Sequence, residues 1–446
     1  MFPLRRCLSA LAVVVLPALP AAGGVQPGPG AERPEFYAPE PELKSCLDNA
    51  ISQHPALLAS RANYQAARER VPQVTALPDP TLNVSQALRS VETRVGSQTG
   101  GITLTQSLPW FGARDLRGRV ALSEADAQFL RLQAEEREVI ARAKRAFYDI
   151  AYLDAALRLL EEERSLLGHY ETLARARYAT GQGLQQAVIR LQAELTRIDD
   201  RQRQLTGQRR TLAVNLNTLC ARSPATAVPP IPAIEPPALS LDRAQLLDLG
   251  ERNRQELRAA TALIEASEDA VELAGMSFRP RFTASLALMN VAGRDPADVL
   301  GPLPPDEGKN SLSLSLGVSL PVWKEKYRAG VEEAGHRLTA NRRRLEEAQD
   351  AMENAVELAL IRIETIREQL ALLEDVLIPQ SEETLHATET AYETSQVGVL
   401  DLLDGERIQL DVLRMRARYV SDFLIALADL ERGIGTRVPQ PAGRAS

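Results

Sequence analysis

Two short segments of this 446-residue chain alternate between apolar and small polar residues. Residues 102–112 read ITLTQSLPWFG, and residues 312–323 read LSLSLGVSLPVW. A period of two is typical of a β-strand with one apolar face. A strand that crosses an outer membrane needs about 9 to 11 residues, apolar toward lipid and polar toward the lumen. These segments therefore limit the possible folds more than any other feature.

Each of these segments is preceded by another alternating run. Residues 81–89 and 279–290 alternate in the same way, and we expect the loops 96–101 and 293–310 to join each run to the next strand. The sequence thus predicts four strands in two hairpins: 81–89 with 102–108, and 279–290 with 311–320.

The rest of the chain is rich in residues that favour helices. Residues 113–180 contain no proline and would form a helix roughly 100 Å long at about 1.5 Å per residue. The predicted helices are 43–77 with a break near Pro55, 113–180, 184–219, 242–274, 324–395 with a kink at Pro379, and 399–433. Two seams at heptad-like spacing should pack against other helices: Ala143, Ala146, Ile150, Leu153, Leu157, Leu160; and Ile363, Ile366, Leu370, Leu373, Leu377.

The plan of helix, hairpin, long helix, turn and long helix occurs twice. Pro109 matches Pro321 at an offset of about 212, and Tyr178 matches Tyr392 at an offset of about 214. We expect a first repeat at 42–222, a proline-rich connector at 223–240, a second repeat at 241–435 and a tail at 436–446.

The N-terminus has the pattern of a secretory signal. Residues 1–23 contain Arg5 and Arg6, then an apolar run at 7–19 and small residues. The alternative is a membrane anchor, for which the run is short. A flexible leader is expected at 24–41. Removing the signal changes the formal charge from −7 to −9 (−7 − 2), which argues against nucleic acid as a partner.

Two cysteines remain after the signal. Cys46 and Cys220 of an exported protein could form a disulfide, or they could be two buried free thiols, and spacing does not decide between these.

No catalytic or cofactor site is predicted. The four histidines are scattered without a second ligand at metal spacing, and no glycine loop is followed by a lysine that could bind phosphate. Acidic pairs such as Glu161 and Glu163 are expected on a solvated helix face. The chain is therefore predicted to have no metal or other cofactor and not to be an enzyme.

Four strands are too few to close a membrane barrel. The smallest closed barrels need about eight strands, and an open edge in lipid leaves backbone groups unpaired. Two copies would supply eight strands and three copies twelve; the internal repeat favours three. The alternative is a soluble sandwich. Against it stand the small polar strand faces and three aromatic residues beyond the strand ends, where an interfacial belt would lie: Trp110, Phe111 and Trp323.

These features resemble the TolC family of trimeric outer-membrane efflux channels. The resemblance rests on the duplication, on LPDP at 77–80, on QSLPWFG at 106–112 followed by ARDLRG, and on turns that begin at Tyr178 and Tyr392. The QSLPWFG segment is most similar to the branch that serves heavy-metal efflux pumps. The resemblance implies a mainly α-helical chain in a homotrimer, with a twelve-stranded barrel in the Gram-negative outer membrane and a helical periplasmic tunnel. It also implies a periplasmic adaptor and an inner-membrane pump, of the RND type, as partners.

The resemblance also implies a gate near the second turn. Residues 392–404 read YETSQVGVLDLLD, in which Asp401 and Asp404 match acidic rings at the entrance and Tyr392 a residue that holds the closed state by hydrogen bonding. Alternatively, two aspartates three residues apart are simply solvated. Ser395 replaces a usual glycine, and Ala187 a frequent acidic partner. The tips expected to contact the adaptor are Gly181, Gly183, Leu184, Gly398 and Val399.

The predicted function is that of a passive outer-membrane exit duct, gated at its periplasmic tip, in a tripartite efflux system. The alternative is a periplasmic helical-hairpin adaptor or scaffold without a pore. The cargo is not predicted by the sequence.

Overall fold

The computed structural model describes residues 40–237, 239, 242–295, 301–394 and 396–439. The expected signal at 1–23, the leader up to residue 39, Ser395 and the end of the tail from residue 440 lie outside the described residues.

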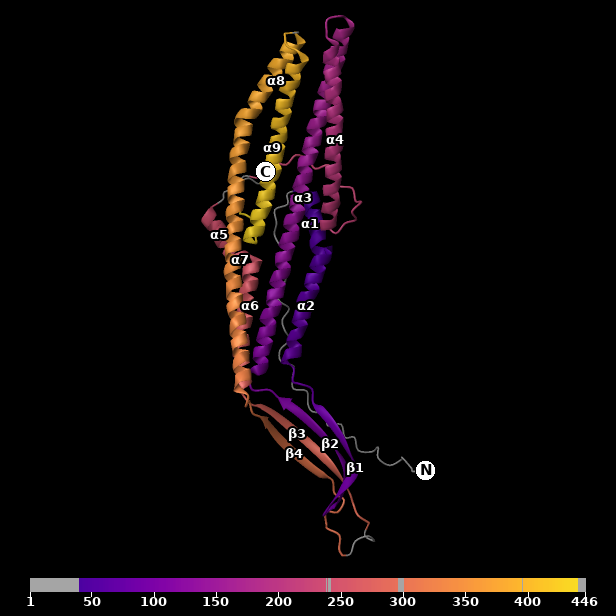
Figure 1. Ribbon diagram of the computed structural model, residues 1–446, viewed down its shortest axis with the longest axis vertical. Coiled ribbons are helices and arrows are strands. Elements are labelled where there is room, and N and C mark those ends of the chain that lie inside the picture. Colours follow the sequence, from indigo (N-terminus) through magenta and orange to yellow (C-terminus); the bar gives the residue numbers. More distant parts are fainter. Residues whose placement is uncertain (1–39, 238, 240–241, 296–300, 395, 440–446) are drawn as a thin grey trace, which may run out of the picture. The chain divides into compact units, whose positions relative to one another are not determined.

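Four strands form one antiparallel sheet in the order β1-β2-β3-β4 (Figure 1). They are β1 (Thr81–Thr93), β2 (Gly96–Leu108), β3 (Arg281–Ala292) and β4 (Ser311–Ser319). The central pair β2 and β3 joins a strand of the first half to one of the second. Each half therefore contributes one hairpin to the sheet.

The register places like residues side by side across the sheet. One row is apolar, and the next is polar on the opposite face. The apolar row consists of Leu82, Leu104, Leu286 and Leu314, and all four side chains are exposed. The polar row consists of Thr81, Thr105, Ser285 and Ser315, and the Thr105 and Ser285 hydroxyls share a hydrogen bond of 3.0 Å. The sheet thus has one apolar and one polar face, as the alternation predicts.

The expected loop at 96–101 is wrong, because these residues belong to β2. A Cβ atom at Gly100 would lie 2.4 Å from the Ser85 carbonyl oxygen, and one at Gly101 would lie 2.6 Å from that of Leu288. The glycines therefore permit close approach of the neighbouring strands rather than marking a turn.

Two pairs of helices precede the hairpins. In the first half they are α1 (Pro41–Gln53) and α2 (Pro55–Thr75), which meet at His54 next to the expected break at Pro55. In the second half α5 (Arg243–Asn253) and α6 (Gln255–Gly275) meet at Arg254, where a single helix was expected; the short turn η1 (Met276–Phe278) follows α6.

The second break has a tertiary cause. The backbone at Arg254 is extended, and Gly435 lies against it so closely that a Cβ there would be 2.7 Å from the Asn253 carbonyl oxygen. Gln255 donates a hydrogen bond of 3.1 Å to the Gly435 carbonyl. No proline marks this break, so the helical pattern continued across it.

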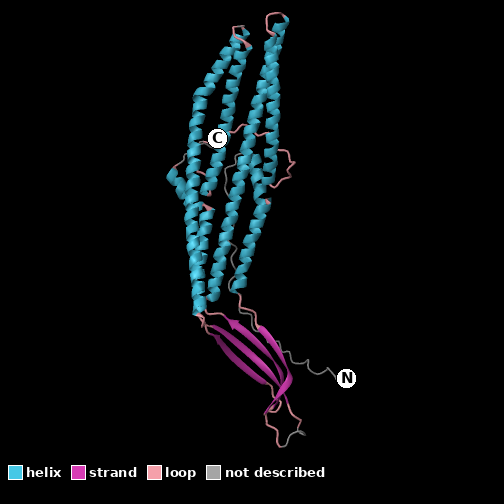
Figure 2. Cartoon of the chain, in the orientation of Figure 1, coloured by secondary structure: helices cyan, strands magenta, loops and turns pink. Residues whose placement is uncertain are grey.

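The long helices form two hairpins (Figure 2). The first is α3 (Ala113–Ala179) with α4 (Gln185–Leu219). The second is α7 (Lys324–Leu372), the π turn η3 (Leu373–Leu377) and α8 (Ile378–Glu393), with α9 (Val399–Ile434). The π turn ends two residues before Pro379, where a kink was expected, and π turns commonly bend helices.

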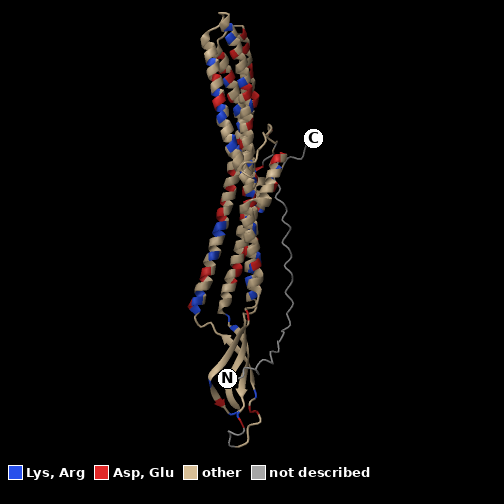
Figure 3. Ribbon diagram, turned by 90° about the vertical axis from the view of Figure 1, so that its right-hand side faces the viewer, with Lys and Arg blue, Asp and Glu red and all other residues tan. Residues whose placement is uncertain are grey.

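Helix α3 organises the packing, because it contacts α2, α4, α6 and α9, while α7 contacts α6 and α9. Both predicted seams are buried, except that Leu157 and Leu377 are only partly so. Charged residues follow the helices along their length, whereas the strands carry almost none (Figure 3). Among the described helices, none combines the length and apolarity needed for a membrane span.

A disulfide joins Cys46 on α1 to Cys220 at the end of α4, with 5.1 Å between the Cα atoms. The connector beyond Cys220 is fixed by Asp154 of α3. This buried carboxylate accepts hydrogen bonds from the Arg209 guanidinium, one of them 3.0 Å long, and from the Ile231 backbone N–H at 2.9 Å.

Candidate gate at the hairpin tips

The two turns differ in how they present the expected tip residues. In the first, Gly181 has φ +74°, a left-handed conformation that favours glycine, and Leu184 is 72% exposed. In the second, Gly398 is exposed but Val399 is buried. Four of the five expected contact residues are therefore at least partly accessible in one protomer, and Val399 packs inward.

Asp401 and Asp404 lie on the first turns of α9 with different surroundings. The Asp401 carboxylate accepts a hydrogen bond of 3.0 Å from the Gly398 N–H and so caps the helix. The Asp404 side chain is 71% exposed, and its nearest ion-pair partner is Arg407 at 4.0 Å. Both carboxylates are exposed, and that of Asp401 also caps the N-terminus of α9.

Tyr392 is buried at the end of α8, between the two hairpins. Its ring lies edge-on to that of Tyr170, with 5.8 Å between centroids, and the Arg177 guanidinium lies over it at 5.0 Å. Arg177 donates hydrogen bonds to the backbone carbonyls of Tyr392 at 3.0 Å and Glu393 at 2.8 Å. No hydrogen bond of the Tyr392 hydroxyl is found among the residues that the structure describes. Tyr392 thus contacts the first hairpin through its ring and its carbonyl.

Further polar contacts between the hairpins lie deeper in the helices. The Tyr170 hydroxyl donates a hydrogen bond of 2.8 Å to Glu389, and Arg407 forms an ion pair of 2.8 Å with Glu194. Burial and the nearby Glu389 raise the pKa of Tyr170. These contacts join α3 to α8 and α4 to α9.

Two carboxylates are buried beside these contacts. Glu163 on α3 is 7% exposed and Glu406 on α9 is 6% exposed, and each has one carboxylate oxygen without a hydrogen-bond partner among the described residues. Burial raises the pKa of Glu163 to about 7, assisted by Glu194 and opposed by Arg414 and Arg407. Burial also raises the pKa of Glu406 to about 7, assisted by Glu389 and Glu163.

The expectation that Glu161 and Glu163 share a solvated face is therefore wrong for Glu163. Glu161 is exposed, but Glu163 follows Leu160 by three residues and so continues the buried seam. That spacing was the available signal. Arg177, Tyr170 and Glu389 had no comparable signal, because their partners lie more than two hundred residues away.

The aromatic residues lie where strands pass into helices. Trp110 is half-buried and stacks on Phe282 with 5.9 Å between ring centroids. Phe111 is 82% exposed and Trp323 is 75% exposed.

These features define a class of protein: a mainly α-helical chain whose long hairpins continue from a four-stranded sheet with one exposed apolar face. Comparison with known sequences identifies the family. The chain belongs to the outer membrane efflux protein family, whose sequence model matches residues 46–222 and 246–436.

Individual relatives agree with this assignment. Nodulation protein T of Rhizobium leguminosarum bv. trifolii is 25% identical over 422 residues, which cover 89% of this chain and 86% of that protein. A membrane protein from Pseudomonas aeruginosa has a similar structure, with a TM-score of 0.72 at 20% identity over 89% of this chain and 94% of the other. The structure of VceC, an outer membrane protein of Vibrio cholerae, is also similar. Its TM-score is 0.71 at 17% identity, over 89% of this chain and 97% of the other.

The comparisons confirm the resemblance to the TolC family and the mainly helical fold with four strands per chain. They also confirm the predicted role as an outer membrane efflux protein, and they do not favour the pore-less adaptor.

Proposed function

We propose that this protein is the outer-membrane exit duct of a tripartite efflux system, a passive channel without catalysis. The observation that carries the proposal is the exposed apolar face of the sheet, shown by the row Leu82, Leu104, Leu286 and Leu314. Exposed leucines on four adjacent strands are unfavourable in water and favourable against hydrocarbon. The sheet would lie in the outer membrane and the helices in the periplasm.

The functional unit would be a homotrimer. The described strands β1 and β4 each pair on one side only, and an unpaired strand edge in lipid is costly. Three chains supply twelve strands, enough for a closed barrel with a lumen, and each chain contributes the two repeats 42–222 and 241–435. Trp110, Phe111 and Trp323 would mark the membrane interface.

The gate and the adaptor contacts would lie at the other ends of the hairpins. Asp401 and Asp404 would line the entrance, and the contact of Tyr392 with Arg177 would hold the second hairpin against the first. Carboxylates that converge near a three-fold axis repel one another and attract cations. The turns around Gly181 and Gly398 would contact a periplasmic adaptor that links the duct to an inner-membrane pump, of the RND type.

The assignment to the heavy-metal efflux branch stays a prediction. Among the residues that the structure describes, no group of three or more His, Cys, Asp or Glu side chains is placed to hold a metal ion. In such a system the pump would select the cargo.

Conductance in planar bilayers tests the proposal. The purified protein should give discrete single-channel steps, and replacing Asp401 and Asp404 together by alanine should reduce its selectivity for cations. The control is Asp248→Ala on α5, away from the hairpin tips, where the side chain is 50% exposed. This substitution should leave the selectivity for cations unchanged. A purified protein that conducts under no condition, and that fractionates as a soluble periplasmic protein, would exclude the duct.

A further inference from the structure

Arg281 is a charged residue on the polar face of the sheet. The residues of this face pair across the strands in five rows, and Arg281 alone is charged among the described residues of these rows. Counted from the helical end of the sheet, the rows are Arg281 and Ser319; Ser107, Thr283 and Gly317; Thr81, Thr105, Ser285 and Ser315; Asn83, Thr103, Ala287 and Ser313; and Ser85, Gly101, Met289 and Ser311.

The charge of Arg281 is not neutralised by a neighbour in the described parts of the chain. Arg281 is the first residue of β3 and is exposed. Its partner on β4 is Ser319, which is uncharged, and no described carboxylate forms an ion pair with it. The guanidinium therefore presents a full positive charge to whatever occupies the polar side of the sheet.

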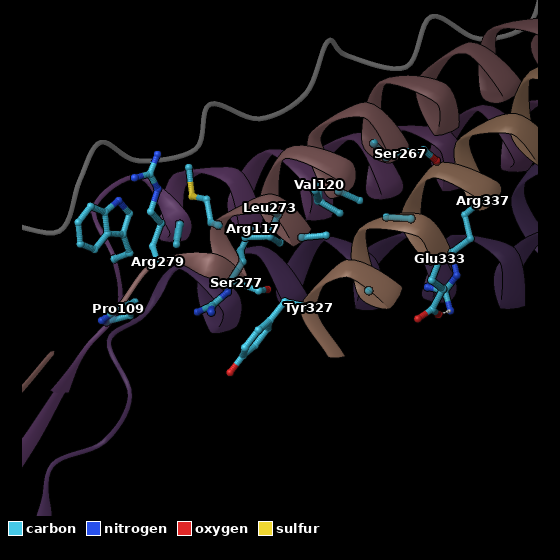
Figure 4. A pocket seen from close by; sticks show the side chains of 18 of the residues that line it. Pro109, Arg117, Val120, Ser267, Leu273, Ser277, Arg279, Tyr327, Glu333 and Arg337 are labelled. Atoms are coloured by element: carbon cyan, nitrogen blue, oxygen red, sulfur yellow. Dashed lines mark ion pairs between the residues drawn. The ribbon is translucent and has the colours of Figure 1, made fainter. Parts of the chain in front are cut away.

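Other basic residues lie at the same end of the sheet. Arg281 and Ser319 line a groove where the strands pass into α3, α6 and α7, and Arg117, Arg279 and Lys326 line it with them. Figure 4 shows Arg117 and Arg279 at this end of the groove.

The acidic residues that line this groove already have basic partners. Glu333 forms an ion pair of 2.6 Å with Arg337, and Glu124 forms one of 3.3 Å with Arg70. Figure 4 shows Glu333 and Arg337 at the end of the groove away from the strands. The excess charge near Arg281 is therefore positive, and it attracts anions.

The side of the sheet that carries Arg281 decides what this charge acts on. If the apolar face lies against lipid, the polar face lines the water-filled lumen. Three chains would then place three Arg281 side chains around the helical end of the barrel. Rings of Arg or Lys in a pore favour anions, just as rings of Asp or Glu favour cations.

We propose that Arg281 is a selectivity-determining residue of the duct and that it favours small anions where the barrel meets the helices. The inference rests on the proposed function, because it requires the polar face to line the lumen. The duct would then have two selectivity elements of opposite sign in series. Asp401 and Asp404 would attract cations at the periplasmic tip, and Arg281 would attract anions at the barrel. Small organic anions are the class of cargo that this second element favours, whereas it repels a free metal cation.

Reversal potentials of the full chain in planar bilayers, measured across a gradient of KCl, test this. Arg281→Gln removes one positive charge per chain and should raise the permeability ratio of K⁺ to Cl⁻ about twofold or more at about 0.1 M salt, where the Debye length is about 10 Å. At about 1 M salt the Debye length falls to about 3 Å, and the difference should vanish. Arg281→Lys keeps the charge and should keep the wild-type ratio.

A second background removes the influence of the tip. A narrow acidic tip would mask a selectivity element further along the duct, so Arg281→Gln is also measured together with Asp401→Ala and Asp404→Ala. The shift toward K⁺ that Arg281→Gln causes should be larger in this background than in the wild type.

The matched control is Arg252→Gln on α5. This side chain is 73% exposed, and α5 lies beside the long helices, away from the strands (Figure 1). The substitution removes the same charge per chain and should leave the permeability ratio unchanged. Circular dichroism checks that each variant is folded.

Two results would overturn the proposal: an unchanged permeability ratio for Arg281→Gln in both backgrounds, or an equal shift for Arg252→Gln. Channels that respond to the Asp401 and Asp404 substitutions but not to Arg281→Gln would leave the duct intact and remove only the role of Arg281. A protein that forms no channel would instead remove the duct itself, and the role of Arg281 with it.

Discussion

The Arg177 guanidinium lies over the Tyr392 ring at 5.0 Å and donates a hydrogen bond of 3.0 Å to the carbonyl of the same residue. These two residues come from different hairpins, and Arg177 also holds the Glu393 carbonyl. The Arg177 side chain therefore links the end of α3 to the end of α8.

Replacing Arg177 by glutamine should loosen the tip. The change removes a cation–π contact and two charge-assisted hydrogen bonds at a partly exposed site, worth about 1–2 kcal/mol together. Openings of single channels in planar bilayers should become about tenfold more frequent, and conductance through each open channel should stay the same.

Arg175→Gln is the control for this change. Arg175 lies two residues away on the same helix, and among the described residues its ion-pair partner is Glu171, one turn earlier. Its removal should leave the opening frequency unchanged. Equal effects of both substitutions would mean that charge on this part of α3, and not the contact with Tyr392, sets the frequency.

The regular elements were predictable because their signals are local. Alternation gives the strand faces, and seams such as Ala143, Ile150 and Leu153 give the buried sides of the long helices. The strand residues Gly100 and Gly101 were assigned to a loop because glycine marks turns more often than close approaches between strands.

The site was only partly predictable. A motif located Asp401, Asp404 and Tyr392, but the Arg177 side chain that binds the Tyr392 carbonyl comes from another hairpin, 215 residues away. Glu163 was misjudged because its neighbours are charged and exposed, although its spacing from Leu160 places it in the seam. Contacts between distant segments leave no trace in local periodicity.

The buried pair Glu163 and Glu406 should make the packing of the hairpins depend on pH. Their pKa of about 7 in the folded protein lies above the ordinary value of 4.5, so the folded state retains protons that the unfolded state releases. Their contribution to stability is fully present below about pH 4.5 and is lost as pH rises through 7. Over that window it should amount to about 1–3 kcal/mol per group.

Thermal unfolding followed by circular dichroism at pH 5, 6, 7 and 8 measures this effect. The double variant Glu163→Gln with Glu406→Gln should lose much of the wild-type fall in Tm between pH 5 and 8. Glu162→Gln, at an exposed neighbour, should keep that fall. If the Tm of the double variant depends on pH in the same way as that of the wild type, the protonation of these carboxylates does not affect the packing of the hairpins.

Asp154 should contribute far more to the free energy of unfolding than an exposed carboxylate that links the same two helices. Asp154→Ala leaves Arg209 without its carboxylate and the Ile231 N–H without its acceptor, at a cost of about 3–5 kcal/mol. Urea unfolding should show this loss, and proteinase K should cut within residues 223–237 faster, because the connector loses its attachment.

Asp199→Ala provides the comparison. Asp199 pairs with Arg164 at 2.9 Å, again between α3 and α4, but both side chains are more than 40% exposed. Its loss should cost less than about 1 kcal/mol and leave the cleavage rate unchanged. Similar losses for the two variants would contradict the role given to burial and to the connector.

The disulfide between Cys46 and Cys220 should contribute strongly to stability, because it closes a loop whose ends are 174 residues apart in sequence. By the chain-entropy relation, a loop of this length is worth up to about 5 kcal/mol, through restriction of the unfolded chain. In a Cys7→Ser background, Cys46→Ala with Cys220→Ala should lower the Tm of the purified protein, and dithiothreitol should lower that of the parent to a similar value. Dithiothreitol should have no effect on the double variant, which controls for effects of the reductant other than cleavage of the disulfide.

Labelling with a maleimide tests the disulfide directly. The denatured, unreduced parent should show no free thiol. Two labelled thiols, together with a Tm that dithiothreitol does not change, would mean that Cys46 and Cys220 are buried free thiols.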